Sequence, residues 1–197
     1  MSALAVCTED LPSRVSQLRA GDRVLLSGVI YTARDAAHKR LFELLDAGKP
    51  LPFEINGAVI YYAGPTPGQQ GMAVGACGPT TAGRMDAFAP RLLDLGLTAM
   101  IGKGERSQSV VDAMVRNGAC YFAAVGGAGA LIARCIETAQ VIAFDDLGCE
   151  SVKRMTVRDL PLTVAIDSRG DDLYKQGRAE YEVKGIGGAC GENGCFT

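Results

Sequence analysis

The chain has 197 residues, a length that suits one compact domain with a hydrophobic core. Its formal net charge of -2 excludes a general electrostatic attraction to nucleic acid or to anionic membranes. No apolar run approaches the ~18 residues of a membrane-spanning helix, and the first residues lack the pattern of a signal peptide. Seven cysteines, an odd number scattered along the chain, favour a reduced cytoplasmic protein over a disulfide framework.

The hydrophobic pattern predicts strands and helices that alternate through the middle of the chain. In chain order we expect helix 11–20, strand 23–31, helix 35–46, strand 58–62, strand 72–74, helix 84–95, strand 97–101, helix 109–117, strand 121–125, helix 129–139, and strands 141–144, 154–157 and 162–167. Pro90 should kink the helix over 84–95 or divide it in two. This order predicts a layered α/β domain over residues 1–175. Residues 176–197 are polar and then glycine-rich, which predicts a flexible tail.

A Gly-Pro turn at 78–79 leads directly into a predicted helix N-terminus, where free backbone N–H groups and the helix dipole favour an anion. Thr80 and Thr81 add hydroxyl groups there, and Arg84 adds a planar fork that suits a carboxylate. An ordinary helix capped by Thr81, with Arg84 in solvent, fits the same residues equally well.

Two further cations lie at strand-to-loop junctions. Lys103 stands between two glycines after a short apolar strand, although lysines in turns are also commonly just solvated. Arg34 follows the strand over 23–31, and Asp35 after it could cap the next helix. His38, the single histidine, lies one helical turn from Arg34, and a supporting or surface role is expected for it rather than catalysis. If the three cations converge, they predict a site for a dianion.

Four motifs in register resemble a known family. They are Tyr-Thr-Ala-Arg-Asp-Ala-Ala-His at 31–38, Ala-Gly-Pro at 63–65, Gly-Pro-Thr-Thr-x-x-Arg-Met-Asp at 78–86 and Gly-Lys-Gly-x-Arg-Ser at 102–107. Their order and spacing, over roughly residues 20–175, are similar to those of the C-terminal domain of class I fumarases. In two-component members of the family, that domain is a separate β subunit.

The resemblance implies a three-layer β/β/α swivelling domain and the reversible addition of water across a dicarboxylate double bond. Fumarate hydration, a step of the tricarboxylic acid cycle, is the favoured reaction, and L-tartrate dehydration is the alternative. The family pairs this domain with an α subunit whose three cysteines hold a [4Fe–4S] cluster. We therefore expect no metal ligand in this chain, activity only with the α subunit, and a homo-oligomer of αβ units.

The same motifs imply roles for individual residues. Arg34, Arg84 and Lys103 would bind the substrate carboxylates, and Thr80 would transfer a proton together with an aspartate of the partner. A threonine hydroxyl is a poor base without a neighbouring carboxylate, and none is evident near Thr80 in this chain. Four further residues would support this set from behind: His38, Thr81, Asp86 and Arg106.

Other functions find less support in the residues. The dinucleotide-binding pattern G-x-G-x-x-G fails, because Ile132 stands where the run from Gly127 needs glycine. A thiol enzyme would require Cys77 with His38 as its base, and we give that pairing little weight. A domain that binds a small carboxylate or regulates a partner without turnover stays open. Cys190 and Cys195 in the tail could ligate a metal, form a disulfide or have no role.

Overall fold

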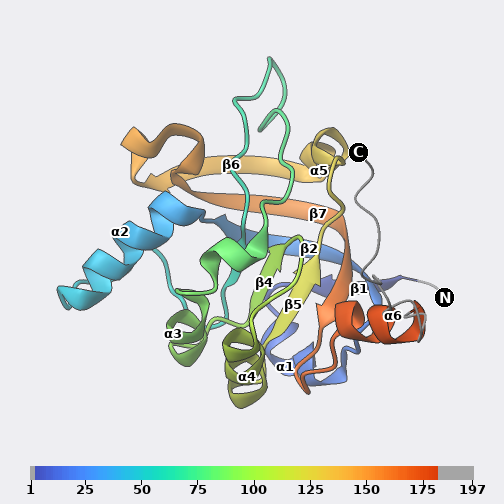
Figure 1. Cartoon of the computed structure of the whole chain (residues 1–197). Coiled ribbons are helices and arrows are strands. Elements are labelled where there is room, and N and C mark those ends of the chain that lie inside the picture. The colour runs from blue at the N-terminus through green and yellow to red at the C-terminus, as the bar shows by residue number, and fades with distance from the viewer. Residues whose placement is uncertain (1–2, 182–197) are drawn as a thin grey trace, which may run out of the picture.

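The computed structural model describes residues 3–181, which form a mixed α/β fold around one seven-stranded sheet with the order β1-β2-β3-β4-β5-β7-β6 (Figure 1). The strands are β1 (Leu4–Cys7), β2 (Arg23–Thr32), β3 (Val59–Tyr61), β4 (Ala99–Gly102), β5 (Cys120–Ala123), β6 (Ile136–Ala143) and β7 (Val152–Ile166). The α-helices are α1 (Leu11–Arg14), α2 (Asp35–Asp46), α3 (Ala89–Asp94), α4 (Gln108–Asn117), α5 (Gly129–Arg134) and α6 (Leu173–Tyr181). Three 3₁₀ helices complete the set: η1 (Val15–Gln17), η2 (Ala82–Met85) and η3 (Asp145–Glu150).

The two longest strands, β2 and β7, form an antiparallel pair along nearly their whole length. The pairing runs from Arg23 opposite Thr163 to Thr32 opposite Lys153, and a bulge interrupts it beside Gly28. Gly28 has φ +118, and a Cβ there would lie 2.1 Å from the Thr8 hydroxyl oxygen. Glycine is therefore required at this bend in β2.

The short strands β3, β4 and β5 connect the two members of this pair. β2, β3, β4 and β5 are parallel neighbours, and β5 then pairs antiparallel with the end of β7. Because β7 also pairs with β2, the hydrogen-bonded strands form a closed circuit. β1 pairs with the first half of β2, and β6 pairs with the first half of β7.

Alternate residues of the three short strands enter two different cores. Tyr61, Ile101 and Phe122 pack with apolar residues of β2 and β7, including Leu26 and Leu160. The residues of opposite parity, Ile60, Met100 and Tyr121, pack with apolar residues of α2, α3 and α4. Both faces of these strands are thus buried, which accounts for their continuous apolar sequences.

The carboxyl ends of the parallel strands β2, β3 and β4 lie at one edge of the sheet, and the loops that leave them carry the predicted cations. The longest of these loops, between β3 and η2, projects from the rest of the molecule at the top of Figure 1. None of the helices within residues 3–181 is long and apolar enough to cross a membrane.

Several predicted elements are confirmed, and others are wrong. The helix over 35–46 is confirmed with its bounds, and the segment 84–95 is divided into η2 and α3, with Pro90 in the first turn of α3. The strand over 72–74 is wrong, because these residues lie in the projecting loop. The helix over 129–139 is wrong beyond Arg134, where β6 begins at Ile136.

At the C-terminal end, the two strands expected over 154–157 and 162–167 are one strand, β7. α6 runs across residue 176 to Tyr181, so the first residues of the predicted tail are helical. The division of the chain at residue 176 stays a prediction. Cys190 and Cys195 lie outside the described residues.

Candidate functional site

Backbone hydrogen bonds hold Thr80 and Lys103 side by side. The Thr80 N–H donates to the carbonyl of Tyr62, 2.7 Å away, at the end of β3. The Lys103 N–H donates to the Thr80 carbonyl over 3.2 Å, and the Ala82 N–H donates to the Lys103 carbonyl over 2.8 Å. The segment that returns from the projecting loop is therefore joined to the end of β4.

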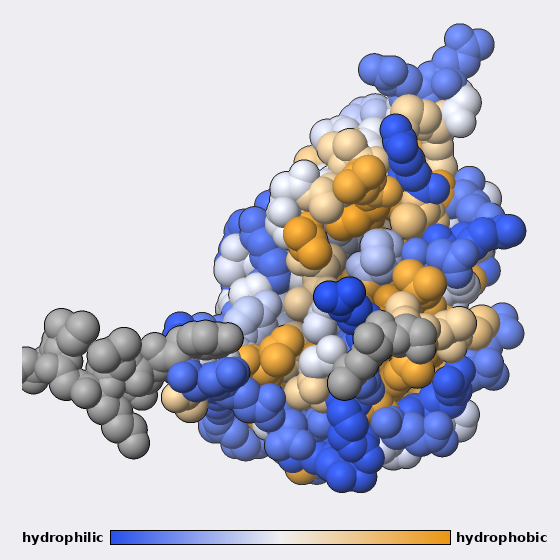
Figure 2. Space-filling model, turned by 90° about the vertical axis from the view of Figure 1, so that its right-hand side faces the viewer, coloured by the Kyte–Doolittle hydropathy of each residue, from blue (hydrophilic) through white to orange (hydrophobic). Residues whose placement is uncertain are grey.

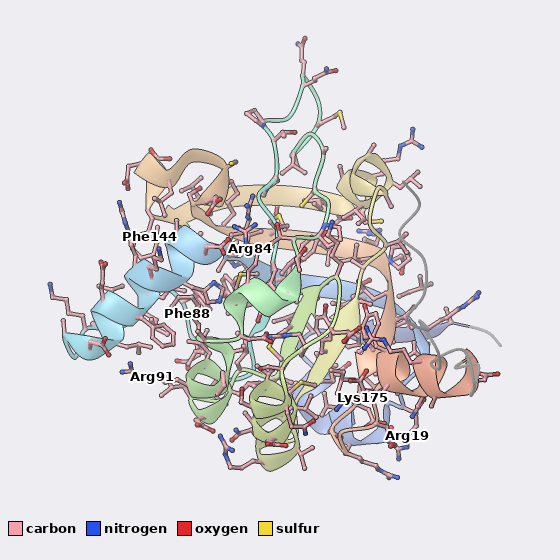
Figure 3. The ribbon with its side chains drawn as sticks, in the orientation of Figure 1. Arg19, Arg84, Phe88, Arg91, Phe144 and Lys175 are labelled. Atoms are coloured by element: carbon pink, nitrogen blue, oxygen red, sulfur yellow. The ribbon has the colours of Figure 1, made fainter. Side chains whose placement is uncertain are left out.

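Arg84 is held by Asp35, the first residue of α2. Its Nε donates to Asp35 Oδ1 over 2.9 Å, and its Nη2 lies 2.8 Å from Oδ2. This contact uses one side of the guanidinium, so the opposite edge, with Nη1, is left for another carboxylate. The Arg84 side chain is 51% exposed, and Figure 3 shows it beside the start of α2.

Arg34 lies immediately before α2 and pairs with a carboxylate of η3. Its Nη2 is 3.1 Å from Glu150 Oε1, and both side chains are about three-quarters buried. Nη1 lies close to Gly64, where a Cβ would come within 3.0 Å of it. Glycine at this position therefore leaves space for the guanidinium next to the loop that follows β3.

The segments that carry the predicted cations and Thr80 are thus neighbours at one edge of the sheet, which the dianion hypothesis requires. Arg34 is adjacent in the chain to Asp35, which binds Arg84, while Thr80 is joined to Lys103. The Lys103 side chain is exposed, and no carboxylate within residues 3–181 forms an ion pair with it. The roles of these residues in binding and catalysis stay predictions.

The predicted helix N-terminus is not what forms the site. η2 has only four residues, and neither Thr81, its N-cap, nor any other side chain makes a cap hydrogen bond there. Asp35 is likewise not a cap, because Arg34 occupies that position at α2. A one-turn 3₁₀ helix has little dipole, so the positive character of the region comes from side-chain charges.

His38 is buried beneath Arg34. Its Nδ1 donates to the Arg34 carbonyl over 2.9 Å, and its ring contacts the rings of Tyr62 and Phe88. Burial lowers the pKa of His38 to about 4, so the ring is neutral near pH 7. The supporting role expected for this residue fits the geometry better than proton transfer to a substrate.

Cys77 does not form the thiol pair considered for His38. Cys77 belongs to the core that contains Tyr61 and Phe122, whereas His38 packs with Tyr62 on the other face of the sheet. Burial raises the pKa of the Cys77 thiol to about 12, so little reactive thiolate forms.

Within residues 3–181, no group of three or more histidine, cysteine, aspartate or glutamate side chains is arranged to hold a metal ion. Residues 3–181 by themselves therefore do not provide the ligands of an iron–sulfur cluster.

The ion pairs that two carboxylates form with the site arginines were not predicted from the sequence. Asp35 was considered only as a cap, and Glu150 was not considered. The position of Asp35 directly after Arg34 does not show which distant arginine its carboxylate binds. Glu150 is separated from Arg34 by more than half the chain, so only the fold could bring them together.

Comparisons with known proteins agree with these motifs. The family model described as Fumarase C-terminus matches residues 2–177. A putative L(+)-tartrate dehydratase subunit beta of Methanocaldococcus jannaschii is 36% identical over 168 residues, which are 82% of this chain and 86% of that protein. Fumarate hydratase 2 of Leishmania major is 39% identical over 83% of this chain, and the anaerobic class I fumarate hydratase of Escherichia coli K12 is 39% identical over 85%. The chain spans only 29% and 31% of the length of these two relatives.

The neutral ring of His38 predicts a loss of stability at acid pH. Its folded-state pKa of about 4 lies below its ordinary value of 6.5, so below pH 6.5 the unfolded chain binds a proton that the folded chain does not. The free energy of unfolding should therefore fall by about 2 kcal/mol between pH 8 and pH 5 from this group alone. Urea unfolding of the wild type and of His38→Gln, whose amide does not titrate, measures the difference. A parallel loss in both proteins would show that the ring keeps an ordinary pKa.

Proposed function

Because the chain belongs to the Fumarase C-terminus family, we propose that it is the β subunit of a two-subunit hydro-lyase that adds water reversibly to a dicarboxylate, with fumarate as the substrate. The observation that carries the proposal is that hydrogen bonds bring together, at one edge of the sheet, the separate segments that carry Arg34, Arg84, Lys103 and Thr80. Three cations and one hydroxyl on neighbouring segments suit a substrate with two negative charges and one proton to be moved.

In this proposal, each cation binds a carboxylate with the atoms that its own chain leaves available. Arg84 offers the edge opposite Asp35, and Arg34 is steadied by Glu150 and offers its remaining donors beside Gly64. Lys103 supplies an ammonium group that forms no ion pair with the carboxylates of residues 3–181. Cations next to the carboxylate would also stabilise the charge that develops when a proton leaves the adjacent carbon.

Thr80 would move that proton, with an aspartate of the α subunit to activate its hydroxyl. The backbone N–H and carbonyl of Thr80 are both hydrogen-bonded, which fixes the position from which the hydroxyl projects. A [4Fe–4S] cluster, proposed to belong to the α subunit, would supply Lewis-acid chemistry when bound. We also propose the three-layer β/β/α swivelling architecture, which the two buried faces of β3, β4 and β5 support.

Exposed apolar side chains on the surface suit contact with a partner subunit. Val125 is 70% exposed and Leu131 is 64% exposed. Figure 2 shows hydrophobic patches between charged groups on the side of the molecule that carries α5 and α6. Exposed apolar patches of this kind mark sites of protein association. A homo-oligomer of αβ units and a cytoplasmic location belong to the same proposal.

L-tartrate dehydration is the second candidate. The tartrate dehydratase β subunit among the relatives matches this chain along most of both lengths, whereas each fumarate hydratase compared above is several times longer. The relative that is named as a separate β subunit, and that has a length similar to this chain, is therefore a putative tartrate dehydratase subunit.

Anaerobic co-expression with the α subunit, followed by assays on fumarate and L-tartrate, tests the proposal. We expect fumarate hydration from the pair and none from either chain alone. A stable, cluster-loaded pair that acts only on tartrate would establish the second candidate. Two chains that fail to associate would overturn both and favour a non-catalytic carboxylate-binding domain.

Replacing Thr80 separates proton transfer from binding. Thr80→Val keeps the shape of the side chain without its hydroxyl, and should lower kcat roughly 100-fold or more with unchanged assembly of the pair. Thr80→Ser, which keeps a hydroxyl, should retain most of the activity. Wild-type kcat in Thr80→Val would remove Thr80 from the mechanism.

Replacing Arg84 tests its two-sided guanidinium. Lysine cannot bind Asp35 on one side and a substrate carboxylate on the other, so Arg84→Lys should raise KM roughly tenfold or more. Arg91→Lys is the matched control, since Arg91 on α3 pairs with Asp46 of the same helix α2 and is also partly exposed. Steady-state kinetics of the pair measures both variants. Equal KM values for Arg84→Lys and the wild type would place Arg84 outside the binding site.

A further inference from the structure

An ion pair between buried Arg106 and partly buried Asp86 adjoins the candidate site. The side chain of Arg106 is 0% exposed, and its Nε donates to the Asp86 carboxylate over 2.7 Å. The guanidinium carbon lies 5.3 Å from the centre of the Tyr62 ring and 5.1 Å from that of Tyr121. Arg106 is thus enclosed by aromatic rings and has one carboxylate partner.

Asp86 connects two segments of the site. One carboxylate oxygen accepts from Arg106 Nε, and the other accepts from the Ser107 N–H over 2.6 Å. Asp86 lies two residues after Arg84, whereas Arg106 and Ser107 end the loop that begins at Lys103. The carboxylate therefore holds the end of the Lys103 loop against the segment that carries Arg84.

The beginning of the same loop is held by backbone contacts. The Lys103 N–H donates to the Thr80 carbonyl, and the Lys103 carbonyl accepts from the Ala82 N–H. Two independent attachments, one at Lys103 and one at Ser107, thus fix the loop to the segment 80–86. Together they determine how far the Lys103 backbone lies from that of Arg84.

Stability alone is a weak reason for this arrangement. A buried ion pair contributes little more than well-packed apolar side chains of the same volume would. Within residues 3–181, three buried polar atoms around it have no hydrogen-bond partner: Arg106 Nη2, the Tyr62 hydroxyl and His38 Nε2. Buried polar atoms without hydrogen-bond partners are rare in protein cores, and they concentrate at functional sites.

We propose that Arg106 and Asp86 are positioning residues that set the separation between Arg84 and Lys103, and thereby select dicarboxylates of four-carbon length. The inference rests on the proposed function, because it takes these two cations as ligands of the substrate carboxylates. Displacing one cation by about 1 Å is enough to lose a large part of oriented binding.

The test compares ligands of different length on the reconstituted pair. Dissociation constants are measured for malonate, succinate and glutarate, saturated dicarboxylates of three, four and five carbons. We expect the wild type to prefer succinate. Arg106→Lys should weaken succinate binding roughly tenfold or more while the other two ligands change by less than about threefold, because lysine keeps the charge but loses the Nε–H donor that holds Asp86.

A second variant and a control accompany this substitution. Asp86→Asn keeps the shape of the side chain but replaces one carboxylate oxygen with an NH2 group, which cannot accept from the Arg106 Nε or the Ser107 N–H that it would face. The same loss of length preference is expected. Arg116→Lys is the control, since Arg116 pairs with Asp94 on the exposed surface of α4 and should bind all three ligands as the wild type does.

Melting temperature and subunit association are recorded for each variant. Loss of the succinate preference in either associating variant supports the proposal. Unchanged binding, an equal weakening of all three ligands, or failure of both variants to associate would assign the ion pair to folding and overturn it. A wild type without length preference would also overturn it. Turnover of fumarate or tartrate by the wild type is measured separately, so an inactive pair that still prefers succinate would count against the proposed reaction alone.

Discussion

The antiparallel pairing of β2 with β7 is the interaction on which the other elements depend. β3, β4 and β5 have only three or four residues each, too few to be stable as an independent sheet. They are held because β2 offers a parallel edge at one side and β7 an antiparallel edge at the other. Their carboxyl ends are thereby fixed at one edge, and the loops that leave them inherit that position.

Local sequence signals were sufficient where an element depends on its own residues. The bounds of α2 follow from its apolar spacing and from Gly48 just after it. They were insufficient at 136–139, which were expected as the end of a helix but begin β6, because β7 offers a strand to pair with. β7 was likewise expected as two strands, over 154–157 and 162–167. In the structure, Asp159 adopts φ +51 and the strand continues through it.

Local sequence signals likewise predicted one part of the candidate site and not the other. Arginine, lysine and threonine at strand-to-loop junctions were recognisable, since parallel strands gather such junctions at one edge. Their motifs in register also allowed the family to be identified. The carboxylates that hold the arginines could not be assigned from the sequence. The residues next to an exposed or half-buried aspartate or glutamate do not indicate which arginine it pairs with. The buried state of His38 depended on Tyr62 and Phe88, which reach it from other segments.

The hydrogen bonds of both the backbone N–H and the backbone carbonyl of Lys103 affect the entropy of ligand binding. Its backbone N–H and carbonyl are already hydrogen-bonded before any ligand arrives, so association need not order the main chain of that loop. Only the rotamers of the lysine side chain remain to be fixed, at a cost of about 2 kcal/mol or less. More of the electrostatic attraction is then available as affinity, which is the benefit of a preorganised site over a mobile loop.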